Sequence, residues 1–237
     1  MQLFFDKNIQ QNDAQFTFDK MESRHIVRVL RKKEGDTLYI TNGQGFLFTS
    51  EISIANEKKC LVNIVTQKKY EKQFDYKLHI AIAPTKNNQR LEWFLEKATE
   101  IGISEITPII CDNSERKVVK LDRLEKVLVS AMKQSNRFYL PKLNEMISFK
   151  EFVKQKKTDN LFIAHCEEET NRTSFKSELK DKNEITLLIG PEGDFSATEI
   201  KEALQNSYQP VSLGNSRLRT ETAALVAVHS VAFYNEK

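Results

Sequence analysis

Hydrophobic and polar positions follow two different patterns along this chain. Between residues 35 and 66, the short runs TLYITNG, FLFTSEISI and CLVNIVT are rich in Thr, Ile, Phe and Val, which is typical of β-strands. The pair Asn42-Gly43 is a strong signal for a hairpin between the first two runs. The preceding stretch SRHIVRVLRKKEGD has one apolar and one basic face. This part of the chain is therefore predicted to form a short basic helix that leads into a small β-barrel.

After residue 75 the chain alternates between strand and helix patterns. The runs KLHIAIA, EITPII, NLFIAH, EITLLIG and QPVSLG predict strands, and apolar residues recur at helical spacing in QRLEWFLEKATEIG, LDRLEKVLVSAMKQ, SFKEFVKQ, TEIKEALQ and the C-terminal stretch. In the first of these helices, Trp93 and Phe94 are expected to lie in the core. This alternation predicts an α/β domain with a mostly parallel sheet. The polar stretch TQKKYEKQFDYK separates the two patterns, so we expect domains over 1–70 and 75–237.

Composition narrows the class of protein. The chain has 237 residues, of which 40% are hydrophobic and 29% charged, and its net charge is +3. No stretch approaches the roughly 20 apolar residues of a membrane span, and the N-terminus does not resemble a signal peptide. The three cysteines are scattered, with no CxxC pair or Cys/His cluster, so no disulfide framework or metal site is predicted. We therefore expect a cytoplasmic protein without a membrane partner. Positive charge is in excess before residue 160, where a polyanion is expected to bind.

Two glycine-bearing turns follow predicted strands, at the position where α/β sheets bind ligands. LLIGPEGDF follows the strand 184–189, and SLGNSRLRTETA follows the strand 209–213. Neither has the glycine pattern of a dinucleotide site or of a P-loop. Each turn alone fits a scaffold as well as a site, because Ser196 with Glu199 forms a capping-box pattern and Thr220 can cap the last helix. Together, on strands that could be neighbours, the turns favour a binding site.

Charged residues at the start of an apolar helix are the second candidate feature. Arg217, Arg219 and Glu221 precede the run AALVAV, and charges beside a buried element need partners. Those partners are either one another and nearby side chains or a ligand. A third candidate is KQSNRFYLP, in which Gln134 and Arg137 at a helix end can contact a base or phosphate, or can bond the last carbonyls of that helix.

Four motifs carry a family resemblance. EKATEIG, KQSNRFYLP, LLIGPEGDFS and LGNSRLRTETAA occur in an order and spacing that resemble the RsmE-type ribosomal RNA methyltransferases of the SPOUT superfamily. These enzymes transfer a methyl group from S-adenosylmethionine (SAM) to N3 of a uridine in small-subunit (16S) ribosomal RNA. The resemblance spans the chain and implies a trefoil-knotted α/β domain after a PUA-like RNA-binding β-barrel. It also implies SAM as cofactor without a metal, ribosomal RNA or the small ribosomal subunit rather than DNA as partner, and a homodimer whose subunits complete each other's active sites.

The same resemblance implies roles for individual residues. Arg219 would face the uracil carbonyls or an adjoining phosphate, and Glu221 would orient it or take the proton. The cofactor would be bound by the two glycine turns and the residues after them, namely Leu188, Ile189, Gly190, Pro191, Gly193, Leu213, Gly214, Leu218 and Thr222. The RNA would be bound by basic and amide side chains, namely Arg24, His25, Arg28, Arg31, Gln134, Arg137 and Arg217.

The chain departs from the usual family pattern at three places. Lys133 stands where family members often have Glu, and Asp194 stands where they often have Gly. Ser216-Arg217-Leu218-Arg219 replaces Arg-Ile-Leu-Arg, so Arg217 comes one place later than the expected first arginine. Three other hypotheses stay open at this point: a non-catalytic RNA-binding or assembly factor, an α/β enzyme for a small nucleotide or phosphorylated metabolite, and a related methyltransferase for another RNA nucleotide.

Overall fold

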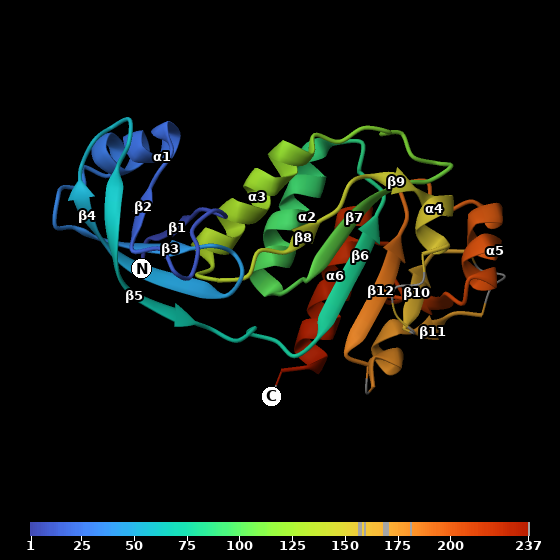
Figure 1. Cartoon of the computed structure of the whole chain (residues 1–237). Helices are drawn as coiled ribbons and strands as arrows, with labels where there is room; N and C mark the ends of the chain where they lie inside the picture. The colour runs from blue at the N-terminus through green and yellow to red at the C-terminus, as the bar shows by residue number, and fades with distance from the viewer. Residues whose placement is uncertain (156–157, 159, 168–170, 181, 237) are drawn as a thin grey trace. The chain divides into compact units, whose positions relative to one another are not determined.

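The computed structural model describes residues 1–155, 158, 160–167, 171–180 and 182–236 (Figure 1). The chain divides into two units near residue 75, where the strand pattern gives way to alternating strands and helices. The first unit comprises Met1–Gln73 and Met132–Leu140, and the second comprises Phe74–Ala131 and Pro141–Lys237. The predicted second domain is therefore interrupted, because a short internal segment packs within the first unit.

The first unit contains a five-stranded sheet in the order β1-β3-β4-β5-β2. Its strands are β1 (Leu3–Phe5), β2 (Gln15–Thr17), β3 (Thr37–Thr41), β4 (Phe46–Ile54) and β5 (Leu61–Lys69). The predicted hairpin is confirmed, because β3 and β4 are antiparallel neighbours and Gly43 adopts a φ of +73° in the turn between them. Strand β5 continues to Lys69, into the polar stretch in which the sequence pattern places the domain boundary.

The basic stretch between β2 and β3 forms two short helices rather than one. Helix α1 spans Lys20–Arg24, and Asp19 caps it by accepting a hydrogen bond of 2.7 Å from the Glu22 amide on Oδ1. The chain then widens into a π-helix, η1 (His25–Val29), in which the Leu30 amide donates to the His25 carbonyl. Ile26 is fully buried in the core under the sheet, while the basic side chains of the segment stay at least partly exposed.

The segment Met132–Leu140 is built into the first unit by close backbone contacts. The Gly45 amide donates to the Phe138 carbonyl at 2.8 Å, and the Tyr139 hydroxyl donates to the Tyr70 carbonyl at 2.9 Å. A Cβ atom on Gly45, whose φ is +92°, would lie 2.3 Å from the Tyr139 hydroxyl oxygen. Glycine is therefore required at this position both by the backbone conformation and by the approach of the tyrosine ring.

The second unit is built on a parallel sheet, as predicted. Its strand order is β11-β13-β10-β12-β6-β7-β8, with β9 also paired to β7, and every pair is parallel. The strands are β6 (Lys77–Ile82), β7 (Glu105–Ile110), β8 (Lys142–Leu143), β9 (Ile147–Ser148), β10 (Leu161–Ala164), β11 (Thr173–Ser174), β12 (Glu184–Ile189) and β13 (Gln209–Ser212). The prediction that the two strands with glycine turns could be neighbours is wrong, because β10 lies between β12 and β13.

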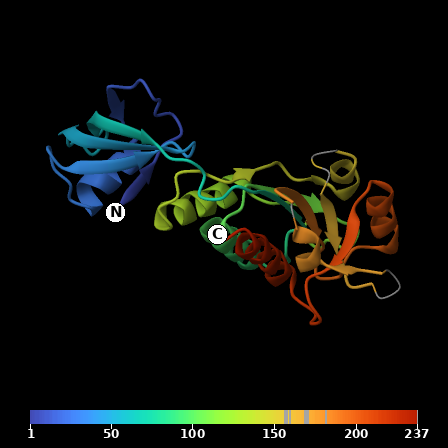
Figure 2. The same ribbon diagram turned by 90° about the horizontal axis from the view of Figure 1, so that it is seen from below.

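Helices cover both faces of this sheet. Helices α2 (Asn88–Ile101) and α6 (Thr220–Tyr234) pack together against one face, whereas α4 (Phe149–Val153) and α5 (Ala197–Gln205) lie on the other (Figure 2). The 3-10 helix η2 (Phe175–Leu179) packs against α6. Helix α3 (Leu121–Gln134) begins in the second unit, and its last turn belongs to the first.

Local signals set where these helices begin. The capping box of α5 is confirmed, because the Glu199 amide donates to Ser196 Oγ and the Ser196 amide donates to the Glu199 carboxylate. The predicted cap of α6 is wrong: Thr220 is its first residue, and Arg219 is the N-cap residue without a side-chain cap bond. Among α2 side chains, Phe94 is fully buried as predicted, but Trp93 is 42% exposed. No helix in the described part of the chain is long and apolar enough to cross a membrane.

Candidate functional site

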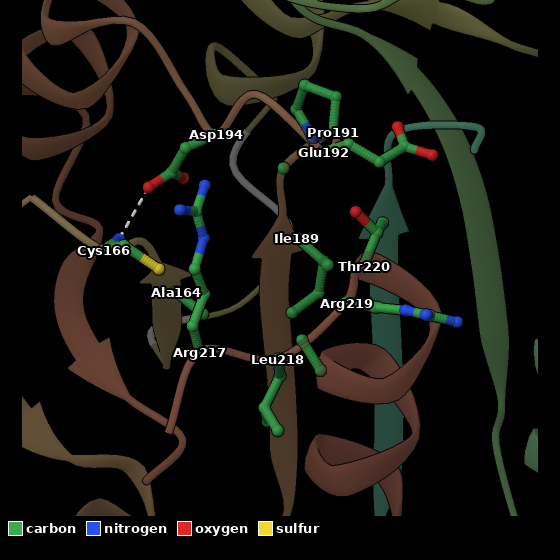
Figure 3. A pocket seen from close by; sticks show the side chains of 12 residues that line it. Ala164, Cys166, Ile189, Pro191, Glu192, Asp194, Arg217, Leu218, Arg219 and Thr220 are labelled. Carbon is green, nitrogen blue, oxygen red and sulfur yellow. Dashed lines mark hydrogen bonds between the residues drawn. The ribbon is translucent and has the colours of Figure 1, made fainter. Parts of the chain in front are cut away.

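A pocket of about 300 Å³ opens at the carboxyl ends of β10 and β12, beside the start of α6 (Figure 3). This is the edge at which open α/β sheets bind ligands, and the volume lies at the lower end of the range for ligand sites, which is about 300–1,000 Å³. The pocket is lined by twelve residues: Ala164, Cys166, Ile189, Gly190, Pro191, Glu192, Asp194, Arg217, Leu218, Arg219, Thr220 and Ala223.

Apolar side chains and exposed backbone form the inner part of the pocket. Ala164, Ile189 and Leu218 contribute small or aliphatic groups from three different segments. At Gly190 the chain passes close to Phe195, and an added Cβ would lie 3.1 Å from that ring and 3.3 Å from its amide nitrogen. Glycine thus lets the β12 turn fold tightly against Phe195. Apolar walls with backbone donors and acceptors suit a flat heteroaromatic group.

Two arginines reach out of the segment before α6 in opposite directions. Arg217 extends toward Asp194, whereas Arg219 extends away from it, on the side of Thr220 (Figure 3). The backbone of Arg219 is extended, with φ −72° and ψ 156°, at the N-cap position where the chain turns into α6. The pocket therefore has one cationic group at each end.

Carboxylates tie the loops around the pocket together. Glu192 Oε1 accepts a hydrogen bond of 3.0 Å from the Lys86 amide, which lies in the loop after β6. The Lys86 ammonium is 2.8 Å from the Glu115 carboxylate. Asp194 Oδ2 accepts a hydrogen bond of 2.7 Å from the Cys166 amide, shown as the dashed line in Figure 3. The carboxylate groups of the β12 turn thus position neighbouring loops.

Glu221 lies apart from these groups. It does not line the pocket, and its Oε1 is 3.7 Å from Nε of Arg90 on α2. The residue is 6% exposed, and its Oε2 has no hydrogen-bond partner among the described residues. Arg219 and Glu221 are two positions apart in the sequence, but the structure directs them to different neighbours.

The predicted cofactor residues divide into two groups. Those that line the pocket are Ile189, Gly190, Pro191 and Leu218. Those that do not are Leu188, Gly193, Leu213, Gly214 and Thr222. Leu188 is a fully buried core residue, and the Gly193 carbonyl accepts a hydrogen bond of 3.2 Å from Asn113 Nδ2. Of the predicted catalytic and substrate residues, the pocket brings together Arg217 and Arg219.

The other predicted substrate residues belong to the first unit. They are Arg24, His25, Arg28, Arg31, Gln134 and Arg137. Arg28 is already paired, because its Nε lies 2.6 Å from Glu57 Oε1. Helix α3 ends where Asn136 adopts a left-handed conformation with φ +51°, and this turn carries Gln134 and Arg137 within the first unit.

Sequence reasoning missed part of the pocket. Ala164 ends β10 and Cys166 follows it, and the rule that ligands bind at carboxyl strand ends would have found them had the strand order been known. Asp194 was visible only as a departure from the family pattern. Burial raises the pKa of the Cys166 thiol, Asp194 raises it further, and Arg172 and Arg217 oppose this. The thiol is therefore protonated at neutral pH.

A second missed feature is a group of three lysines on aromatic rings, which we call the β5 lysine cluster (Lys68, Lys69 and Lys72). Their ammonium groups lie 4.7 Å from the Tyr70 ring centroid, 5.7 Å from Phe46 and 5.7 Å from Tyr139, respectively. Basic residues interleaved with aromatics are typical of single-stranded nucleic-acid surfaces. The sequence signal KKYEK lies in the polar stretch in which the sequence pattern places the domain boundary.

The part of the chain that the structure describes contains no candidate metal site. No group of three or more His, Cys, Asp or Glu side chains there is arranged to hold a metal ion.

Family models match both units of the chain. A model described as an RNA methyltransferase domain covers residues 72–232, and one described as an RNA methyltransferase PUA domain covers residues 18–65. Together with the parallel sheet and its pocket, these matches define the class of protein as an RNA methyltransferase with an N-terminal PUA domain.

Individual relatives narrow this class. A ribosomal RNA small subunit methyltransferase E from Buchnera aphidicola is 31% identical over 90% of this chain and 86% of its own length. The Bacillus subtilis protein of the same name is 26% identical over 93% of this chain and 91% of its own length. This chain therefore belongs to the ribosomal RNA small subunit methyltransferase E family.

Solved structures agree with this assignment. A probable rRNA methyltransferase from Porphyromonas gingivalis is 38% identical, with a TM-score of 0.89 and coverage of 99% of this chain and 98% of that one. A methyltransferase from Legionella pneumophila, solved in complex with SAM, is 26% identical, with a TM-score of 0.87 and coverage of 98% and 97%.

Proposed function

We propose that this protein transfers the methyl group of SAM to N3 of a uridine in small-subunit (16S) ribosomal RNA, acting in the cytoplasm on the assembled subunit. The observation that carries the proposal is the pocket at the carboxyl edge of the parallel sheet, with Arg219 at its rim, in a chain of this family. The names of the relatives support small-subunit ribosomal RNA as the substrate. The choice of N3 of uridine rests on the resemblance of the four motifs.

The residues of the pocket fit SAM. Ile189, Gly190 and Leu218 offer apolar surface and backbone groups for the adenine, and charged groups flank the pocket for the polar parts of the molecule. The Legionella relative with bound SAM supports this assignment. When bound, SAM supplies an electrophilic methyl group on its sulfonium.

The protein must then make the uridine a nucleophile. The N3–H group of uridine is a weak acid that stays mostly protonated at neutral pH. Its proton must pass to water as the methyl group is transferred, and the loss of this proton leaves negative charge on the ring carbonyls. We assign Arg219 to stabilise that charge, because its guanidinium extends from the pocket rim and can donate several hydrogen bonds. Glu221 contacts Arg90 from the first turn of α6 and thereby helps to hold the start of the helix at which Arg219 lies. Alignment of N3 with the methyl group supplies a further part of the rate enhancement.

We assign RNA binding to the first unit. Its match to an RNA methyltransferase PUA domain supports this role. The predicted basic residues Arg24, His25, Arg28 and Arg31 offer one contact surface, although Arg28 already pairs with Glu57. The β5 lysine cluster offers another, because none of its lysines forms an ion pair within the described residues. Gln134 and Arg137 belong to the same unit and are candidates to contact the target nucleotide.

We also propose a homodimer. Helix α6 is apolar on nearly all sides, yet its neighbours in the second unit cover only part of it, leaving Phe233 61% and Tyr234 44% exposed. Such a helix normally lies inside a core or an interface. Trp93 on the adjacent α2 is 42% exposed as well. A second copy of the chain would cover these side chains, and sedimentation of the purified protein would show its mass.

The predicted knot remains part of the proposal. The chain passes from β12 across β10 to β13, and α6 then returns to pack against β6 and α2. This order supports a C-terminal segment that threads through an earlier loop.

The decisive experiment is a methyl-transfer assay with SAM and small ribosomal subunits that lack their modifications, followed by mass spectrometry of the nucleosides. N3-methyluridine is the expected product. A different methylated nucleoside would support another member of the superfamily, and SAM binding without any product would support a non-catalytic RNA-binding factor. The free RNA serves as a control, because a product on the assembled subunit alone is expected.

A further inference from the structure

Asp194 occupies a backbone conformation that favours glycine. Its φ is +63°, and of the four non-glycine residues with positive φ in the described chain, namely Arg31, Asn136, Asp194 and Ser207, it is the one that lines the pocket. Glycine adopts such a φ without strain. An aspartate here needs a compensating interaction of its side chain.

The Asp194 carboxylate makes two hydrogen bonds, one on each oxygen. Oδ1 accepts from the amide of Phe195 at 2.8 Å, and Oδ2 accepts from the amide of Cys166 at 2.7 Å. The second bond joins residues 28 positions apart and connects the turn after β12 to the segment after β10. Both of these segments line the pocket.

The backbone around Asp194 is held from another direction as well. Asn113 Nδ2 donates to the carbonyl of Gly193 at 3.2 Å and to the carbonyl of Asp194 at 3.1 Å. The turn is therefore anchored by Asn113, and the side chain that extends from it is free to fix the neighbouring wall. The bond to the Cys166 amide is the link between the two walls that a glycine at position 194 would lack.

We propose that Asp194 is a positioning residue that joins the two walls of the cofactor pocket and holds them at the spacing that SAM requires. The proposal rests on the proposed function of the pocket. A wall that is already fixed loses less conformational freedom when the ligand binds, so the affinity for the ligand rises. The same carboxylate lies on the side of the pocket toward which Arg217 extends, so it also favours one orientation of that guanidinium (Figure 3).

Two substitutions separate this role from a simple effect on stability. Asparagine has nearly the same shape and tolerates positive φ, but its single acceptor oxygen can replace only one of the two bonds. Glycine loses both bonds but relieves the backbone. Asp194→Gly is therefore expected to weaken ligand binding without a matching loss of stability. Ser207→Gly is the matched control, because Ser207 also has positive φ, at 67°, and lies outside the pocket.

The experiment is titration calorimetry with S-adenosylhomocysteine, the demethylated product of the cofactor, together with thermal unfolding and steady-state kinetics. We expect Kd to rise about 10-fold in Asp194→Gly and about 3-fold in Asp194→Asn, because the loss of two bonds or of one acts on the ligand only indirectly, through the spacing of the walls. The KM for SAM should rise similarly while kcat at saturating SAM stays unchanged. Ser207→Gly should leave Kd at the wild-type value.

The outcomes distinguish this inference from the proposed function. Wild-type Kd values in both Asp194 variants would overturn the inference and leave the methyltransferase assignment intact. The expected rise in Kd, combined with no methyl transfer to ribosomal RNA by the wild-type protein, would support the inference and overturn the proposed reaction. A fall in kcat with an unchanged KM would also overturn the inference, because it would place Asp194 in the chemical step.

Discussion

The Glu221 carboxylate lies 3.7 Å from Nε of Arg90 and connects the first turn of α6 to the first turn of α2. Glu221 is almost completely buried, and Arg90 is its one ion-pair partner among the described residues. The carboxylate also lies near the N-terminus of α6, where the helix dipole favours negative charge. The pair therefore fixes the helix that carries Arg219 at its N-cap.

Removing either side chain should destabilise the second unit. We expect Glu221→Gln and Arg90→Ala each to lower the free energy of unfolding by about 1–3 kcal/mol, because each leaves a charged or polar partner without its counterpart. The double variant should lose less than the sum of the two, with a coupling of about 0.5–2 kcal/mol. Urea unfolding measures all three values. Additive losses would show that the two side chains do not interact.

A second ion pair that involves α2 serves as the control for this double-mutant cycle, with Arg123 on α3 as its basic partner. Arg123 pairs with Glu92 of α2 at 2.6 Å, but its side chain is 58% exposed. Arg123→Ala should therefore cost no more than about 1 kcal/mol.

Arg217 and Arg219 should separate in kinetic experiments, because they extend from opposite sides of one segment. We expect Arg219→Ala to lower kcat by about 10²–10³-fold, the usual effect of removing a donor that stabilises a developing anion, while the Kd for SAM stays near the wild-type value. Arg219→Lys should recover part of the rate, because the charge remains but the paired donors are lost. Steady-state kinetics with saturating SAM measure this.

Arg217→Ala serves as the comparison. This residue extends toward Asp194 rather than toward the Arg219 side of the pocket (Figure 3), so its loss should raise the KM for RNA or SAM more than it lowers kcat. A wild-type rate for Arg219→Ala with normal SAM binding would exclude the role assigned to Arg219.

The secondary structure was largely predictable because periodicity is a local signal. EITPII corresponds to β7, and LDRLEKVLVSAMKQ corresponds to α3 without a shift at either end. The strand order was not predictable, because it depends on packing between distant segments. The insertion of β10 between β12 and β13 leaves no trace in the sequence of any one strand.

The candidate site was likewise predictable only in part. The glycine turns identified the correct edge of the sheet, since Ile189, Gly190 and Leu218 do line a pocket there. The expectation that Glu221 would serve the same pocket followed from its nearness to Arg219 in the sequence. A helix turns by about 100° per residue, so Glu221 points toward α2 once α6 has begun at Thr220. The contact between Asp194 and Cys166 joins two loops and has no periodic signal.

His165 should make stability depend on pH. It is 4% exposed, and its ring nitrogens have no hydrogen-bond partner among the described residues. Burial lowers the pKa of His165 below its ordinary value of 6.5; nearby Asp194 opposes this, and Arg172 adds to it. The unfolded chain therefore binds this proton more readily than the folded protein does. The free energy of unfolding should fall as the pH drops through about 6.5, until the folded form is protonated as well.

The test is urea unfolding between pH 7.5 and 5.5, above the range in which most carboxylates titrate. Replacing the ring by a non-titrating side chain, in His165→Gln, should flatten the dependence over this interval. An equal slope in wild type and His165→Gln would show that another group is responsible.

The β5 lysine cluster should contribute to RNA affinity through phosphate contacts. Lys68, Lys69 and Lys72 are exposed, and the Tyr70 ring beneath Lys68 packs on Phe138, with centroids 4.4 Å apart. Replacing the three lysines by glutamate should weaken RNA binding by about 10-fold or more at low salt and reduce the slope of log K against log salt, since fewer counterions are then released. Fluorescence anisotropy with a labelled ribosomal RNA fragment measures both quantities.

A matched pair of exposed lysines, Lys58 and Lys59, lies in the loop between β4 and β5 of the same unit, away from the aromatic group. Lys58→Glu with Lys59→Glu reverses two positive charges rather than three and should have a much smaller effect. The corresponding reversal of Arg24 and Arg31 tests the surface predicted from the sequence. If charge reversal at Arg24 and Arg31 abolishes RNA binding while the triple variant of the β5 lysine cluster leaves the salt slope unchanged, the RNA contacts the helical segment instead of the lysine cluster. If both weaken binding and reduce the slope, the two surfaces contact the same RNA.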